Sequence, residues 1–245
     1  MRMTSIIIPT CNGLELLASC VEAIRTHTST PYEIIVADNG SADGTLEYCI
    51  RERLTFVSFA DNAGFPAACN AGLKLAAGDA LLLLNNDVVV SRNWLDNMLA
   101  CLDSTPDTGI VGPCSNYVSG RQQAAGEYAS MEEFHSWAVE RNLPDSSRWV
   151  VLERLVGFCF LFKRELLQQI GYLDERFSPG HYEDDDYCYR ARLAGYRLVI
   201  AGDTFVHHHG SVSFKKQDSS VLAGLIDRNH RKFIEKWGID PRQYI

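Results

Sequence analysis

The sequence contains no long apolar run and no cysteine pair. No window of the 245-residue chain approaches the roughly 18 consecutive apolar residues of a membrane-spanning helix, so we expect no transmembrane segment. None of the eight cysteines belongs to a CxxC pair, and most lie among apolar residues. This pattern predicts buried, reduced thiols in a cytoplasmic protein.

Acidic residues outnumber basic residues in this chain. Lys and Arg number 23 against 31 Asp and Glu, which gives a net charge of −8. A nucleic-acid-binding surface is normally basic, so we expect no nucleic-acid partner. A phosphate ligand is still compatible with an acidic chain, because backbone amides or a divalent cation can hold it.

The chain begins MRMTSIIIPTCNG, a short apolar segment that is followed at once by Pro9 and a turn. This pattern predicts a first strand and not a signal peptide, which has a longer apolar stretch and a cleavage site. We expect a cytoplasmic protein that can also contact the inner face of a membrane peripherally.

Strand-like and helix-like patterns alternate over the first part of the chain. Asn12 and Glu15 form a capping-box pattern at the start of one helix, and Pro66 suits the first turn of another. The alternation predicts a single-domain α/β fold with a doubly wound, mostly parallel sheet flanked by helices. The strand patterns occupy residues 4–10, 32–41, 54–62 and 80–87.

The pattern after Ser91 is less regular. We expect an amphipathic helix over RNWLDNMLACL, a short strand at GIVGP and a helix around residues 134–141. A strand followed by a helix is expected within residues 149–171, and a final helix at about 219–237.

Each of the four predicted strands ends in Asn or Asp, within PTCN, ADNGS, ADNAG and NND. Ligands of such sheets bind at the carboxyl ends of the strands, so four polar clusters in register predict a binding cleft. In LLLLNNDVVV, Asn85, Asn86 and Asp87 interrupt a buried apolar pattern, where an unpaired polar group costs several kcal/mol. We expect the triplet to meet a charged ligand; a strand closed by an Asx turn is the alternative.

The chain resembles the family 2 glycosyltransferases of the GT-A fold, and above all their rhamnosyltransferase-like branch. The resemblance covers residues 4–214 and rests on the order and spacing of several motifs. These are SIIIPTCN, VADNGSADGT, NAGFPAACNAG, LLLLNNDV, VGFCFLFKRELLQQIGYLDERF, YEDDDYCYRARLAGYR and HHHGSVS.

The resemblance also implies how the chain is organised. Residues 1–214 would form the glycosyltransferase domain, with a nucleotide-sugar-binding half at 1–112 and an acceptor-binding, catalytic half at 113–214. Residues 215–245 would form a C-terminal helical extension. The variable stretch 115–147 is expected to form a lid over the acceptor.

Asp87 matches the last position of the family's DxD motif, here Asn-Asn-Asp, which holds a divalent cation on the donor diphosphate. Mg²⁺ or Mn²⁺ prefers oxygen ligands and takes one or two carboxylates together with substrate phosphates. His208 is implied to complete this metal site, with His207 and His209 as alternatives.

Asp38 matches the family residue that hydrogen-bonds the nucleotide base. A carboxylate accepts the imide N–H of uracil or thymine, whereas cytosine has no such donor, so a UDP- or dTDP-linked sugar is expected. The full nucleotide-sugar-binding set that the resemblance implies is Pro9, Thr10, Asp38, Asn39, Asn62, Gly64, Asn70, Asn85, Asn86 and Gly157.

The segment HYEDDDYCYRARLAG places four acids at a predicted helix N-terminus. The helix dipole favours each nearby carboxylate by only about 0.3–1 kcal/mol, and four adjacent ones repel each other. The match to the family's ED-x-D pattern pairs Glu183 with Asp184 and makes Asp186 the third acid. Asp184 is the expected general base, with Glu183 as the alternative, and crowding of like charges is expected to raise one of these pKa values.

The expected activity is inverting, metal-dependent transfer of a sugar from a nucleotide-diphosphate donor to a glycan, lipid-linked or protein-linked hydroxyl. Two other classes stay open. A nucleotidyltransferase that makes sugar nucleotides would have a Gly-rich, basic loop early in the chain, whereas PTCNGLELL has no Lys or Arg. A sugar-nucleotide-binding module without turnover would lack an acid cluster facing the donor.

Overall fold

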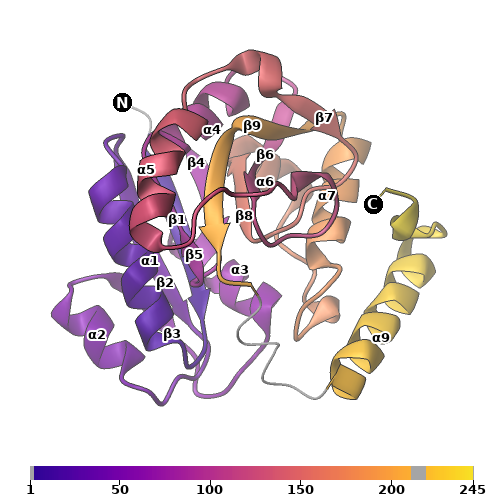
Figure 1. Cartoon of the computed structure of the whole chain (residues 1–245). Coiled ribbons are helices and arrows are strands. Elements are labelled where there is room, and N and C mark those ends of the chain that lie inside the picture. The colour runs from indigo at the N-terminus through magenta and orange to yellow at the C-terminus, as the bar shows by residue number, and fades with distance from the viewer. Residues whose placement is uncertain (1–2, 211–218, 245) are drawn as a thin grey trace.

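The computed structural model describes residues 3–210 and 219–244 as a central mixed sheet with helices on both faces (Figure 1). The predicted domain boundary between residues 214 and 215 lies outside the described residues. So do residues 211–213 of the HHHGSVS motif.

The nine described strands follow the order β3-β2-β1-β4-β8-β6-β9-β5, and β7 pairs with β9. The neighbours β3/β2, β2/β1, β1/β4 and β6/β9 are parallel, whereas β8 runs antiparallel to both β4 and β6. The predicted α/β fold with a mostly parallel sheet is therefore confirmed. The strands are β1 (Thr4–Thr10), β2 (Tyr32–Asp38), β3 (Thr55–Ser58), β4 (Ala80–Leu84), β5 (Val88–Val89), β6 (Thr108–Ser115), β7 (Val150–Leu152), β8 (Cys159–Lys163) and β9 (Arg197–His208).

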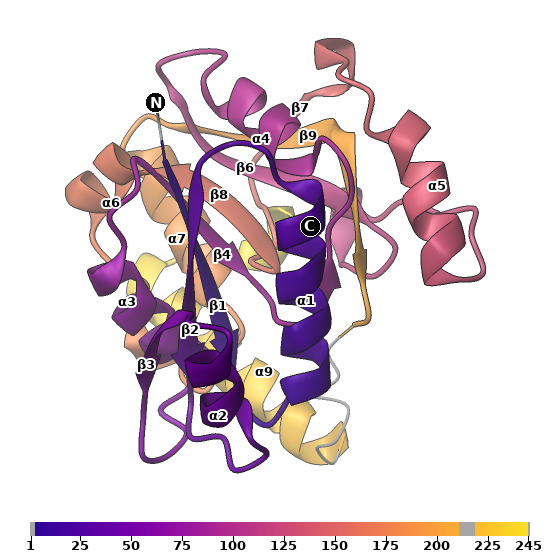
Figure 2. The same cartoon turned by 90° about the vertical axis from the view of Figure 1, so that its left-hand side faces the viewer.

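Helices cover both faces of this sheet: Figure 2 shows α1 and α5 on one side of the strands and α3 and α6 on the other. No helix within the described ranges 3–210 and 219–244 is long and apolar enough to cross a membrane. The α-helices are α1 (Leu14–His27), α2 (Thr45–Arg51), α3 (Phe65–Leu75), α4 (Trp94–Leu102), α5 (Met131–Arg141), α6 (Arg164–Ile170), α7 (Glu183–Leu193) and α9 (Ser219–Trp237). Short 3-10 turns are η1 (Gly120–Gln122), η2 (Ser146–Arg148), η3 (Glu175–Phe177) and η4 (Pro241–Tyr244).

The burial of the strands explains their composition. Every residue of β1 and of β4 is buried, as expected for strands covered by helices on both faces. In α1 the apolar residues at helical spacing, Leu17, Cys20, Val21 and Ile24, are buried as well. The final helix has the predicted bounds, and α3 carries Pro66 in its first turn, as predicted.

The predicted capping box at Asn12 is wrong. Helix α1 begins at Leu14 after Gly13, and no side chain of its own start caps it. Asp43 accepts the Leu14 N–H at 2.9 Å instead, while the Asn12 side-chain oxygen accepts the Ala42 N–H at 2.8 Å. The cap therefore comes from the loop after β2, which local sequence does not reveal.

The strand register brings the polar strand ends to one edge. Thr10 pairs with Asp38, and Asp38 pairs with Ser58, at the carboxyl ends of β1, β2 and β3. Because β8 is antiparallel to β4, the residues that precede it arrive at the same edge. There the Asn85 N–H donates to the Phe158 carbonyl at 2.8 Å.

Gly72 in α3 tests the packing of this core. An ideal Cβ on Gly72 would overlap Ile7 Cγ2 in the fully buried centre of β1. We predict that Gly72→Ala lowers the free energy of unfolding, because overpacking costs about 1–3 kcal/mol while the gain in helix propensity is only about 1 kcal/mol. Urea unfolding measures the difference.

Gly224 in α9 is the matched control, since no described atom lies within 4 Å of a Cβ placed there. Gly224→Ala should raise the free energy of unfolding by about 0.5–1 kcal/mol. Equal stabilisation by both substitutions would contradict the packing of α3 on β1.

Candidate functional site

A cavity of about 880 Å³ opens at the carboxyl edge of the sheet. Its wall includes the segments that follow β1, β2, β3, β4 and β6, the segments that precede β8 and α7, the end of β9, the starts of α3 and α7, and parts of α9 and η4. Eleven predicted site residues line it, namely Pro9, Thr10, Asn39, Asn62, Asn85, Asn86, Asp87, Gly157, Glu183, Asp184 and His208.

Asp38 does not line the cavity. Its side chain is fully buried, and its carboxylate accepts the Ser58 hydroxyl at 2.8 Å and the Ser41 N–H at 3.2 Å. In this structure the Asp38 carboxylate holds the turn after β2, and its contact with a nucleotide base stays a prediction. Its neighbour Asn39 reaches the cavity instead.

Gly64 and Asn70 also lie outside the wall. Gly64 has φ +95°, and a Cβ there would lie 2.7 Å from Ser178 Oγ, so glycine permits a close approach of two loops. The Asn70 side chain accepts the Leu173 N–H at 3.0 Å and donates to the Leu173 carbonyl and to Glu175, each at 2.9 Å. Both residues hold α3 against the segment that precedes α7.

The Asn-Asn-Asp triplet forms the turn between β4 and β5, so β4 ends at Leu84 rather than at residue 87. Asn86 donates its side-chain N–H to Thr10 Oγ1 at 2.8 Å. Asn85 Oδ1 is buried, and no donor within the described residues reaches it. Asp87 is only 6% exposed, and its Oδ1 lies 3.1 Å from His208 Nε2.

The partners of His208 determine what its ring presents to Asp87. The Tyr117 carbonyl lies 2.7 Å from His208 Nδ1 and can only accept, so we assign the proton to Nδ1. Phe158 stacks on this ring at 5.1 Å between centroids and fixes its orientation. With the Nδ1 proton directed at the Tyr117 carbonyl, Nε2 faces the Asp87 carboxylate, and a proton or a metal cation between these two atoms stabilises the arrangement.

This pair fits a divalent cation. A carboxylate oxygen and an imidazole nitrogen are both ligands that Mn²⁺ accepts. Across residues 3–210 and 219–244 there is no group of three or more His, Cys, Asp or Glu side chains that could hold a metal. Asp87 and His208 would supply two ligands to such a cation, and a bound diphosphate and water would supply the others.

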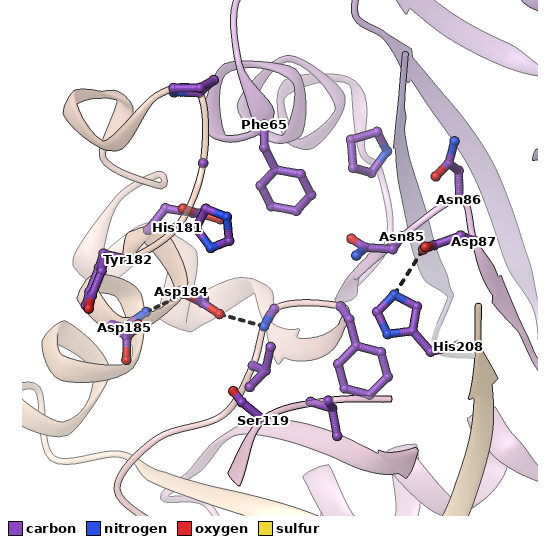
Figure 3. Close-up of a pocket in the computed structure, with 18 of the residues that line it drawn as sticks. Phe65, Asn85, Asn86, Asp87, Ser119, His181, Tyr182, Asp184, Asp185 and His208 are labelled. Carbon is purple, nitrogen blue, oxygen red and sulfur yellow. Dashed lines mark hydrogen bonds and ion pairs between the residues drawn. The ribbon is translucent and has the colours of Figure 1, made fainter. Parts of the chain in front are cut away.

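Asp184 lies across the cavity from Asp87 and His208, and Phe65 points into the space between them (Figure 3). The Asp184 Oδ2 accepts the Gly157 N–H at 2.9 Å, and the Asp184 Oδ1 accepts the Asp185 N–H at 2.9 Å. A Cβ on Gly157 would lie 3.1 Å from Asp184 Cβ. Gly157 therefore lets β8 approach and orient this carboxylate.

The two acids beside Asp184 have raised pKa values. Burial, followed by the charge of Asp184, raises the pKa of Glu183 well above its usual range, and no described donor reaches its buried Oε2. Burial and Asp184 also raise the pKa of Asp185 to about 6, although its ion pair with Arg154 opposes the shift. Burial and the charge of Asp184 thus favour the protonated form of Glu183.

Asp186 is not a third acid of the cavity, contrary to the prediction. It is fully buried and outside the wall. Arg190 and Lys236 pair with its carboxylate at 2.8 and 2.6 Å, and Trp237 donates to it at 2.8 Å. Asp186 therefore anchors α9 to α7.

Sequence reasoning missed several residues of the wall, among them Phe65, Arg154, Asp185, His181 and Tyr182. Asp185 belongs to the acidic run at the start of α7, but its partner Arg154 comes from a segment without a motif. His181 and Tyr182 have φ 70° and 76°, conformations that cost non-glycine residues about 1–3 kcal/mol each. Composition does not signal such strain.

The predicted acceptor lid at 115–147 is only partly at the cavity. Tyr117, Val118, Ser119 and Gln123 line it, whereas α5 packs against β9 and lies outside the wall. Any lid function therefore belongs to residues 117–123.

A family model described as "Glycosyl transferase family 2" matches residues 5–171. The uncharacterized protein y4gI of Sinorhizobium fredii is 30% identical over 96% of this chain and 27% of its own length. The N-acetylglucosaminyl-diphospho-decaprenol L-rhamnosyltransferase of Mycobacterium tuberculosis is 29% identical over 80% of this chain and 72% of its own. The chain thus spans about a quarter of the first of these relatives.

Solved structures show the same architecture. The mannosyltransferase PcManGT from Pyrobaculum calidifontis, in complex with GDP-Man and Mn²⁺, superposes with a TM-score of 0.63 at 22% identity. The match covers 84% of this chain and 56% of the mannosyltransferase. This likeness shows that the chain has the GT-A fold.

Cys11 lines the cavity and is half-buried, while the other seven cysteines are buried. We predict that N-ethylmaleimide modifies one thiol per native chain, and that peptide mass spectrometry locates it at Cys11. Burial and then Asp38 and Asp43 raise the pKa of this thiol above 9.0. Because the thiolate is the reactive form, the labelling rate should still increase as the pH rises past that value.

Cys11→Ser is the control and should leave the native protein unlabelled, while denaturant exposes the other seven thiols. Labelling of a second cysteine in the native chain would contradict the described packing of the core.

Proposed function

Because this chain belongs to glycosyltransferase family 2, we propose that it transfers a sugar from a nucleotide-diphosphate donor to an acceptor hydroxyl, with inversion at the anomeric carbon. One observation carries the proposal. A single cavity holds the pair Asp87–His208 on one wall and the carboxylate of Asp184 on another (Figure 3). This arrangement suits a charged leaving group on one side and proton abstraction on the other.

The donor half of the proposal rests on the strand ends. Pro9, Thr10, Asn39 and Asn62 would bind the nucleoside, and Asn85 Oδ1 offers a ligand hydroxyl an unused acceptor. Asp87 and His208 would hold Mn²⁺ or Mg²⁺, which when bound neutralises the negative charge of the diphosphate as a Lewis acid. UDP and dTDP are the proposed nucleotides, and GDP joins the candidates because the solved mannosyltransferase binds GDP-Man.

The acceptor half depends on which acid takes the proton. A carboxyl group that already carries its proton cannot accept another, and burial raises the pKa of Glu183, which makes Glu183 the weaker candidate for the base. Asp184 is partly exposed in the cavity, and its oxygens each receive one N–H and keep further lone pairs. Asp184 therefore takes the proton of the acceptor hydroxyl, whose oxygen attacks the anomeric carbon as the nucleoside diphosphate departs.

The acceptor is proposed to be a glycan or a lipid-linked glycan on the cytoplasmic side of a membrane. Tyr117, Val118 and Ser119 form the wall it would approach. Product analysis distinguishes the rival classes: a nucleotidyltransferase releases pyrophosphate from a nucleoside triphosphate, and a binding module releases nothing. The proposed enzyme releases a nucleoside diphosphate.

Asp184→Asn tests the assignment of the base. The substitution keeps the shape of the side chain and removes its ability to accept a proton, so release of nucleoside diphosphate from sugar nucleotides should fall by about 10²–10⁴-fold. Nucleotide affinity should stay nearly unchanged, because Asp87, His208 and the strand ends are intact. A coupled assay for the released nucleoside diphosphate and calorimetric titration with UDP measure the two quantities.

Glu153→Gln is the matched control, since Glu153 carries an exposed carboxylate outside the cavity wall. It changes the net charge by the same amount and should retain full activity. Equal loss of turnover and nucleotide binding in Asp184→Asn would refute the assignment.

A further inference from the structure

Helix α9 closes the cavity on the side of the catalytic acids. Ile226 of α9 and Pro241 of η4 line the wall together with Tyr182 and Asp184. Lys236 of α9 pairs with Asp186 of α7, so these two helices, which lie on either side of β9 in chain order, are in contact (Figure 1). The C-terminal segment is thus part of the site's architecture.

One residue of α9 makes an unusual set of contacts. Asn229 is fully buried, and its Nδ2 lies 2.6, 2.8 and 3.1 Å from the carbonyl oxygens of Phe177, Gly180 and His181. A carbonyl oxygen only accepts, so Nδ2 is the donor, and its two N–H groups are shared among the three carbonyls. Three carbonyls of a single loop therefore converge on one side-chain nitrogen.

The loop that Asn229 holds has a strained backbone. His181 and Tyr182 are consecutive non-glycine residues with positive φ, and they lead directly into Glu183 at the start of α7. Such conformations persist only when the surrounding structure determines them strongly. The first turn of α7 depends on this loop, because the Asp186 N–H donates to the Tyr182 carbonyl at 2.9 Å.

Neighbouring side chains of α9 repeat the pattern. Arg228 donates to the Ser178 carbonyl at 3.2 Å, and Lys232 donates to the Arg176 carbonyl. One helix therefore binds the backbone of residues 176–181 at several points. Asn229 is the buried contact among these, and the carbonyl nearest to the acids, that of His181, is one of its partners.

We propose that Asn229 is a positioning residue for Asp184: by holding the Phe177–His181 carbonyls it fixes the left-handed turn that aims the start of α7 into the cavity. The inference rests on the proposed function of Asp184. It implies that α9 belongs to the catalytic unit, and that the predicted division after residue 214 would separate the base from its support.

Asn229→Ala in the full chain tests this inference. A displacement of about 1 Å in a reacting group can cost about 100-fold in rate, so kcat for release of nucleoside diphosphate should fall by about that factor. The KM for the sugar nucleotide should change less than about 3-fold, because the strand ends and the Asp87–His208 pair are untouched. Asn229→Ser, which keeps a small donor, should restore part of kcat.

Asn97→Ala is the matched control for the loss of a buried amide. Asn97 is equally buried in α4, outside the cavity wall, and donates to the Asn142 and Asp203 carbonyls at 3.0 and 2.9 Å. It should lower the melting temperature as Asn229→Ala does and leave kcat within about 3-fold. Equal losses of kcat in the two variants would contradict the inference and show that Asn229 has only a structural role.

Amide hydrogen exchange tests the same inference without substrate. The amides of Gly180 and Asp186 should exchange faster in Asn229→Ala and not in Asn97→Ala, since their bonds close the supported loop. Unchanged exchange at these two amides would overturn the inference. Faster exchange in a protein that turns over no sugar nucleotide would uphold the loop contact and show that the proposed function, separately, is wrong.

Discussion

The register of the parallel strands determines where everything at the cavity lies. Thr10 and Asp38 pair across β1 and β2, and β4 runs parallel to β1, so three strands deliver their carboxyl ends to one edge. Because β8 then inserts antiparallel to β4, Gly157 and Phe158 arrive at the same edge from the second half of the chain. A shift of register in any of these pairs would separate the donor residues from the acids.

The acid cluster at the start of α7 is stable because the surroundings of each carboxyl group offset its negative charge in a different way. Glu183 is buried, which raises its pKa and favours its neutral form, Asp185 pairs with Arg154, and Asp186 is neutralised by cations of α7 and α9. Breaking one partner of such a buried pair typically costs about 3–5 kcal/mol, so these arrangements are not interchangeable. They leave Asp184 facing the cavity, where the N–H groups of Gly157 and Asp185 orient its carboxylate.

Most of the fold could be predicted from periodicity, and the placement of Asp87, His208 and Asp184 at one cavity could be predicted from motif order. The direction in which an individual side chain points could not be predicted in this way. Asp38 ends β2, and its carboxylate accepts the hydroxyl of Ser58, its partner residue in β3, a contact that the sequence of β2 alone does not reveal. The contacts of Asn229 with the Phe177–His181 loop could not be predicted from the sequence either, because they join two segments that only the tertiary structure brings together.

The central claim is that the Asp87 side of the cavity binds a nucleoside diphosphate together with a divalent cation. Thermal unfolding of the wild type and of Asp87→Ala with UDP, dTDP, GDP and CDP, each with and without Mn²⁺, tests it most directly. A nucleotide present at about 100 times its Kd stabilises the fold by roughly 2.7 kcal/mol. The account predicts an Mn²⁺-dependent rise in melting temperature with UDP or dTDP that is lost in Asp87→Ala. No shift with any nucleotide, or an equal shift in the variant, would contradict it.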